Sequence, residues 1–145
     1  MDDFPTALEL AAAIRAKELS PTEALTETLR RIDERNPAVN AVTWRDGEDA
    51  RRRARAIDDL VASTPSEELP AFAGVPIPIK DLTPVAGWPV TYGSAGASED
   101  PSPQSELVVE AFEGGGFVLA GRTNTPEFGP ITAAENVRCG ISRNP

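Results

Sequence analysis

The chain of 145 residues contains no histidine and a single cysteine, Cys139. Ser-His-Asp and Cys-His catalysis cannot be assembled from such a chain, because both mechanisms need an imidazole base. A zinc site of the usual His/Cys type is also excluded, since one cysteine cannot supply the ligands. We therefore expect no metal and no cofactor. Any general base contributed by this chain must be a carboxylate, a tyrosine or a lysine.

The sequence also lacks a long apolar run and an excess of basic residues. Its net charge of −9 argues against general nucleic-acid binding, which depends on basic patches that meet phosphates. No apolar stretch is long enough for a membrane span, and the acidic start Met1-Asp2-Asp3 differs from the basic start of a signal peptide. One cysteine cannot form an internal disulfide, so the cytoplasm is the expected compartment.

The first sixty residues carry the signals of three helices. Thr6 and Glu9 form a capping-box pattern, and the segment Ser20-Pro21-Thr22-Glu23 is a stronger helix start of the same kind. The pair Asn36-Pro37 is expected to stop this second helix, because a residue before proline avoids the helical region. A third helix is predicted from about residue 46 to residue 61.

The pattern changes at about residue 71. Three apolar residues, Val75, Ile77 and Ile79, alternate with prolines, and this period of two predicts a strand. The prolines restrict it to an edge, bulged or bent strand. Residues 83–103 are rich in Gly, Pro, Ser and Thr and predict a long shaped loop, which is a class of loop that is usually functional or disordered.

A helix and a second strand are predicted after this loop. The helix covers about residues 105–113, and the residues expected to face inward are Leu107, Val108, Ala111 and Phe112. Gly114–Gly116 end it, and the segment FVLAG predicts a short buried strand. The order strand, connection, helix, strand is typical of a crossover unit, so the fold class is predicted to be α/β.

A lysine stands at the end of the first predicted strand, in the segment GVPIPIKDL of residues 74–82. Lys80 and Asp81 are the only charged residues between Ala71 and Ser98. Burial in an uncharged environment is what converts a lysine into a base near neutral pH, because low dielectric disfavours the ammonium form. Asp81 is expected to point to the opposite face of a continuing strand. The alternative is that the side chain of Lys80 simply extends into water.

Three blocks of the sequence, in order, closely resemble the amidase signature family. They are GVPIPIKDLTPVAGWPVTYGSA, ELVVEAFEGGGFVLAGRTNTPEFG and AENVRCGISRNP. The resemblance covers roughly Ala71 to Pro145, and the preceding helices fit the N-terminal region of the family. It implies an α/β/α sandwich on a mixed sheet. Residues 1–145 would form an incomplete domain of this kind, with a helical region over 1–62 and the start of the α/β core over 71–145.

The resemblance implies hydrolysis of a linear amide C–N bond, or ammonia release for transfer, by a Ser–cis-Ser–Lys mechanism. One serine attacks the carbonyl, a second serine relays its proton, and a neutral lysine is the final base. Lys80 occupies the position of that lysine. In the family both serines lie in a Gly/Ser-rich segment downstream of the block that ends here at Asn144-Pro145, so the chain is expected to be truncated before it. Ser94, Ser98 and Ser142 do not fit either serine motif.

The expected substrate is a small-molecule amide, and the expected partner is a complementing C-terminal chain or a second copy in a homo-oligomer. The alternative is a noncatalytic fragment or pseudo-enzyme that acts as a pairing subunit. Asn124 follows the second predicted strand, where α/β sites often lie, and is a candidate substrate-binding residue. Stabilisation of the turn by its side chain is the competing interpretation.

Three other motifs favour ordinary interpretations. Cys139 and Lys80 together suggest the Glu-Lys-Cys hydrolases of C–N bonds, but the context VRCGIS does not resemble their nucleophile motif. The run RRRAR at residues 51–55 has acidic neighbours and predicts a salt-bridged helix face, with Asp49–Arg53 as one pair. The glycines of GGGFVLAG end a helix instead of opening one, which argues against a dinucleotide loop.

Overall fold

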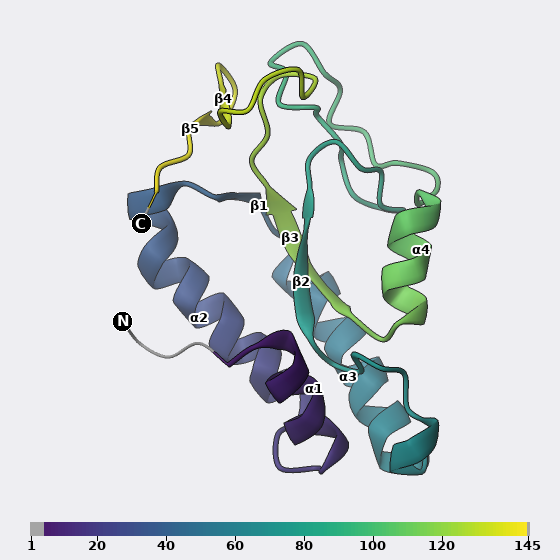
Figure 1. The fold of residues 1–145 in the computed structure, drawn as a ribbon. Helices are drawn as coiled ribbons and strands as arrows, with labels where there is room; N and C mark the ends of the chain where they lie inside the picture. The colour runs from purple at the N-terminus through teal and green to yellow at the C-terminus, as the bar shows by residue number, and fades with distance from the viewer. Residues whose placement is uncertain (1–4, 145) are drawn as a thin grey trace. The chain divides into compact units, whose positions relative to one another are not determined.

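The computed structural model describes residues 5–144 (Figure 1). Its helices and strands are mixed along the chain. The helices are α1 (Ala7–Arg15), α2 (Pro21–Val39), α3 (Gly47–Ser63) and α4 (Leu107–Gly114), with a 3₁₀ turn over Ser66–Glu68. The strands are β1 (Val42–Trp44), β2 (Pro76–Lys80), β3 (Val118–Thr123), β4 (Glu135–Asn136) and β5 (Gly140–Ile141). This order confirms the predicted α/β class.

The three predicted helix starts are confirmed by their capping hydrogen bonds. The Thr6 hydroxyl accepts from the Glu9 N–H at 3.2 Å, and the Glu9 carboxylate accepts from the Thr6 N–H at 2.7 Å. Ser20 and Glu23 exchange the same pair of bonds at the start of α2. The Asp46 carboxylate accepts from two N–H groups of the first turn of α3. Each cap satisfies donors that the first helical turn leaves open.

The predicted end of α2 at Asn36-Pro37 is wrong, because the helix continues through Pro37 to Val39. A proline near the end of a helix removes one hydrogen bond and has few following turns to disrupt. The helix ends at Val39 and is followed by Asn40, which has a φ of 52° and donates its N–H to the Asn36 carbonyl at 2.7 Å. Asparagine tolerates this left-handed conformation better than most residues.

The predicted crossover unit is confirmed, and it forms part of a three-stranded sheet of order β1-β3-β2. β1 pairs with β3 antiparallel, with Val42 opposite Thr123. The mixed sheet therefore has β2 at an edge, as its prolines predicted. Sequence patterning did not predict β1, because three half-buried residues give no measurable alternation.

The predicted inward face of α4 is largely wrong. Leu107 is 83% exposed and Val108 is 46% exposed, whereas Val109 is fully buried. Ala111 is exposed and Phe112 is half-buried. A run of consecutive apolar residues places side chains all around a helix, so the period of 3.6 that identifies one inward face is absent.

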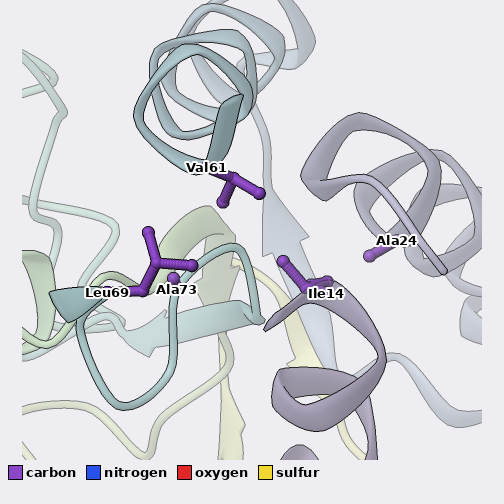
Figure 2. Packing of buried hydrophobic residues seen from close by; sticks show 5 residues of the cluster. All are labelled: Ile14, Ala24, Val61, Leu69 and Ala73. Carbon is purple, nitrogen blue, oxygen red and sulfur yellow. The ribbon is translucent and has the colours of Figure 1, made fainter. Parts of the chain in front are cut away.

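The chain divides into two compact units, each built from three segments. The first unit comprises Met1–Arg30, Asp46–Ile77 and Phe112–Ala120. Its core is a cluster of five buried side chains from helices α1, α2 and α3 and the segment that precedes β2, shown in Figure 2: Ile14, Ala24, Val61, Leu69 and Ala73. The rings of Phe72 and Phe117 stack in the same unit with centroids 4.7 Å apart.

The second unit comprises Arg31–Arg45, Pro78–Ala111 and Gly121–Pro145. It contains every candidate site residue that the sequence suggested, namely Lys80, Asn124 and Cys139. The predicted loop over 83–103 contains no helix or strand, and two isolated bridges, Ala86–Ser102 and Pro89–Pro101, bring its arms together. Within residues 5–144, no helix is long and apolar enough to cross a membrane.

Candidate functional site

Lys80 is the last residue of β2, and its side chain is exposed. Its two neighbours along the chain, Ile79 and Asp81, are each only 4% exposed. The alternation of a strand therefore separates the lysine from the adjacent carboxylate, as predicted. Among residues 5–144, no carboxylate forms a salt bridge with Lys80. Burial of the Lys80 side chain, once a C-terminal portion covers it, remains a prediction.

The carboxylate of Asp81 is buried and hydrogen-bonded to the loop that follows it. Its Oδ1 accepts from the Thr91 N–H at 2.9 Å, and its Oδ2 accepts from the Thr91 hydroxyl. A longer bond of 3.4 Å comes from the Gly93 N–H. The Asp81 N–H in turn donates to the Thr123 carbonyl at 3.1 Å. The residue after Lys80 thus connects β2, β3 and the turn at Thr91.

A buried arginine, which sequence patterning did not indicate, lies beside this carboxylate. Arg122 on β3 is 1% exposed, and its Nε lies 3.8 Å from Oδ1 of Asp81. Its Nη1 donates to the Thr83 carbonyl at 2.9 Å, and its guanidinium lies 5.6 Å from the centroid of the Trp88 ring. The only sequence signal was an arginine within an otherwise apolar strand, which arginine rarely occupies unless it is paired.

A cavity of about 660 Å³ opens in the second unit on the Asp81 side of β2. Its lining includes Asp81, Arg122 and Cys139, whereas Lys80 does not line it. Arg138 also lines the cavity and pairs with Glu99, which makes the balance of formal charges around it close to neutral. This size lies in the range of small-molecule sites. The cavity is thus distinct from the surface that carries the lysine.

Cys139 lies at this cavity and has a raised pKa. Burial is the main cause and the Asp81 charge adds to it, whereas a hydrogen bond with Thr43 and the charge of Arg138 oppose the shift. A raised pKa reduces the thiolate fraction, and the thiolate is the reactive form. Cys139 therefore lacks the electrostatic activation that a nucleophilic cysteine needs, in agreement with the ordinary interpretation of VRCGIS.

We predict that iodoacetamide alkylates Cys139 more slowly than a free cysteine peptide at pH 8. The rate should increase as the pH rises through the raised pKa, because the thiolate then forms. The measurement is mass-spectrometric alkylation kinetics between pH 7 and pH 10, with the urea-unfolded chain as the control. A native rate at pH 8 equal to the unfolded rate would contradict the prediction.

Asn124 is buried, and both ends of its side-chain amide are hydrogen-bonded within the second unit. Its Nδ2 donates to the Gly140 carbonyl at 3.2 Å and to the Ser142 hydroxyl at 3.0 Å. Its Oδ1 accepts from the Thr125 N–H and from the Asn136 side chain. The structure therefore gives Asn124 a role in holding the β4–β5 hairpin. Substrate binding by this residue remains a prediction.

The three serines that lie near the sequence motifs are each engaged in local hydrogen bonds. The Ser98 hydroxyl donates to Asp100, the Ser142 hydroxyl donates to the Asn40 carbonyl, and the Ser94 hydroxyl accepts from the Gly96 N–H. Such bonds cap turns and strand ends, which is a common use of serine in loops. Across residues 5–144, no cluster of three or more His, Cys, Asp or Glu residues is arranged to hold a metal ion.

The other two motifs have the ordinary roles that their contexts predicted. In the first unit, Asp49 on α3 pairs with Arg53 at 2.6 Å and also with Arg52. Arg53 forms a second ion pair with Glu113. These pairs confirm a salt-bridged helix face. The first three glycines of GGGFVLAG, Gly114–Gly116, form the end of α4 and the connection to β3, where a dinucleotide loop would not be found.

The comparisons with known proteins agree with these features. The family model named Amidase matches residues 23–145. An acylamidase from Rhodococcus erythropolis is 34% identical over 140 residues, covering 97% of this chain and 29% of the relative. One of the subunits of a glutamyl-tRNA(Gln) amidotransferase from Acidothermus cellulolyticus is 39% identical, covering 97% of this chain and 27% of the relative.

Solved structures give the same result at the level of the fold. A bacterial aryl acylamidase of the amidase signature family superposes with a TM-score of 0.88 at 28% identity, over 97% of this chain and 29% of that one. A 6-aminohexanoate cyclic dimer hydrolase superposes with a TM-score of 0.85 at 31% identity, over 99% of this chain and 28% of that one. The chain spans less than a third of the length of these relatives. With its ordered motifs and its mixed α/β fold, the chain belongs to the amidase signature family.

Proposed function

We propose that this chain contributes the lysine base of an amide-hydrolysing enzyme that uses a Ser–cis-Ser–Lys mechanism. The observation that carries the proposal is the placement of Lys80. The side chain is exposed at the end of β2 in this chain, where the C-terminal portion would bury it, while the carboxylate of the next residue is buried and bonded to Thr91. A base must reach the group that it deprotonates and must not be held as an ion pair.

The substrate class is a small-molecule amide, and the products are a carboxylic acid and ammonia or an amine. The names of the relatives support this class, since an acylamidase and amidotransferase subunits occur among them. The two serines and the oxyanion donors of the mechanism would come from a C-terminal portion of the enzyme. We keep the cytoplasm as the proposed compartment, because the single cysteine offers no internal disulfide.

The test is an ammonia- and amine-release assay over a panel of aliphatic amides, aryl amides and glutamine. It compares the 145-residue chain with the same chain joined to a C-terminal portion from a family member. The chain alone should show no turnover, because loss of even one oxyanion donor costs about 10²–10³ in rate and the proposal assigns all of these donors to the C-terminal portion. The joined form should hydrolyse at least one class of amide. Turnover by the 145-residue chain would contradict the proposed division of the mechanism.

A second candidate function is that of a noncatalytic pairing subunit. Large apolar side chains on the second unit favour it, because Leu107 is 83%, Phe128 67% and Val137 92% exposed. Burial of such side chains against a partner chain would remove apolar surface from water and stabilise a complex. The same assay separates the two candidate functions. A joined form that folds, but releases no ammonia or amine from any amide of the panel, would favour the pairing subunit.

A further inference from the structure

The second unit contains one buried cation, Arg122, whose hydrogen bonds are incomplete. In the part of the chain that the structure describes, its Nε and Nη2 atoms have no hydrogen-bond partner. Burial lowers the pKa of its guanidinium, and the charge of Asp81 opposes this shift. Burying an unpaired charge is expensive, so such a group persists only where another charge compensates it.

Asp81 is the compensating charge, and the two residues contact the same loop at three places. Arg122 binds the carbonyl of Thr83 and faces the Trp88 ring. Asp81 binds the backbone and the hydroxyl of Thr91. The loop therefore touches the pair near its start, in its middle and at the turn where it changes direction.

The backbone of the turn at residues 91–94 is strained, so contacts from neighbouring residues must hold it. Tyr92 has a φ of 54° and Gly93 a φ of 67°, so two consecutive residues are in the left-handed region. A non-glycine residue in this region is strained and persists when its surroundings hold it. The Ser94 N–H closes the turn on the Thr91 carbonyl at 2.8 Å, and Asp81 binds the Thr91 side of it.

We infer that Asp81 and Arg122 are a positioning pair that holds the loop segment from Thr83 to Ser94 against the end of the strand that carries Lys80. The carboxylate fixes the 91–94 turn, and the guanidinium lies beside the carboxylate as a counter-charge while it holds the loop at Thr83. The inference rests on the proposed function only for its catalytic consequence, which is that the loop next to the base keeps one arrangement during turnover.

Amide hydrogen exchange on the 145-residue chain tests the pair without reference to activity. The measured quantity is the exchange rate of the Thr91 and Gly93 N–H groups, divided by that of the Val118 N–H, which bonds to the Val75 carbonyl in the first unit. This ratio should increase about tenfold in Asp81→Asn and in Arg122→Met, because local opening then becomes easier. An unchanged ratio in both variants would overturn the inference.

Two further variants distinguish loss of the Asp81–Arg122 pair from a general loss of stability. Arg122→Lys keeps a cation beside Asp81 and should recover most of the protection. An exchange ratio in Arg122→Lys as high as that in Arg122→Met would contradict the charge pairing. Arg53→Met removes a half-buried arginine with two ion pairs from the first unit and should leave the ratio unchanged. If Arg122→Met does not fold, the Asp81→Asn ratio decides.

The catalytic consequence is measured on the chain joined to a family C-terminal portion. Arg122→Met should lower kcat about tenfold with KM within about twofold, because the substrate is still bound while the loop beside the base is displaced. Arg53→Met should change neither constant. If the unsubstituted joined form is inactive, the proposed function fails and the exchange ratios still decide on the pair. An increased exchange ratio together with an unchanged kcat in Arg122→Met would refute the catalytic consequence.

Discussion

Replacing Lys80 by alanine is expected to lower kcat of the joined enzyme by about 10²–10⁴, the range that a positioned general acid or base contributes. KM should change little, because the lysine acts on the reacting serines and not on bound substrate. Folding should be unaffected, since the side chain is exposed in this chain. The measurement is steady-state ammonia release with the best amide of the panel, together with the thermal unfolding midpoint of each variant.

The chain supplies its own control for this prediction, because Lys17 is its only other lysine and is also exposed. Lys17→Ala should retain full activity. Lys80→Arg should be as inactive as Lys80→Ala, since a guanidinium keeps its charge but does not give up a proton near neutral pH. Activity of Lys80→Ala within twofold of the unsubstituted enzyme would remove the role assigned to this lysine.

Replacing Gly116 by alanine is expected to destabilise the chain by about 2–5 kcal/mol. Gly116 is buried with a φ of +87°, and an added Cβ would lie 2.8 Å from the Ala73 Cα and 2.9 Å from the Pro70 Cβ. Strain of the left-handed backbone contributes about 1–2 kcal/mol, and overpacking against a backbone that cannot move aside contributes about 1–3 kcal/mol more. Denaturant unfolding of the variant measures the sum.

Gly87 is a matched control for the steric part of this effect. It has nearly the same φ, +82°, but an added Cβ would meet no atom within 4 Å. Gly87→Ala should therefore show only the conformational cost of about 1–2 kcal/mol. Equal destabilisation by the two substitutions would mean that the contact with Ala73 and Pro70 is not what requires glycine at position 116.

Helix starts and the strand that carries the lysine could be predicted from the sequence because their signals are local. A cap such as Thr6–Glu9 is formed by residues three apart, and the prolines around Ile77 restrict any strand that contains them to an edge. The opposite orientations of Lys80 and Asp81 follow from the period of a strand. The end of α2 differs from the prediction because the left-handed backbone of Asn40, and not Pro37, terminates the helix.

Local sequence signals could not predict the buried pair of Asp81 and Arg122. These residues are 41 positions apart in the numbering, and nothing in either segment indicates that the other will lie beside it. The same holds for the hydrogen bonds of Asn124 to the hairpin and for the inward orientation of Val109 on α4. Burial and the compensation of charge depend on which segments the folded chain brings together. Local sequence patterns and the family resemblance together pointed to Lys80 as the candidate base, whereas the groups that hold its surroundings became visible once the strands and the long loop were in place.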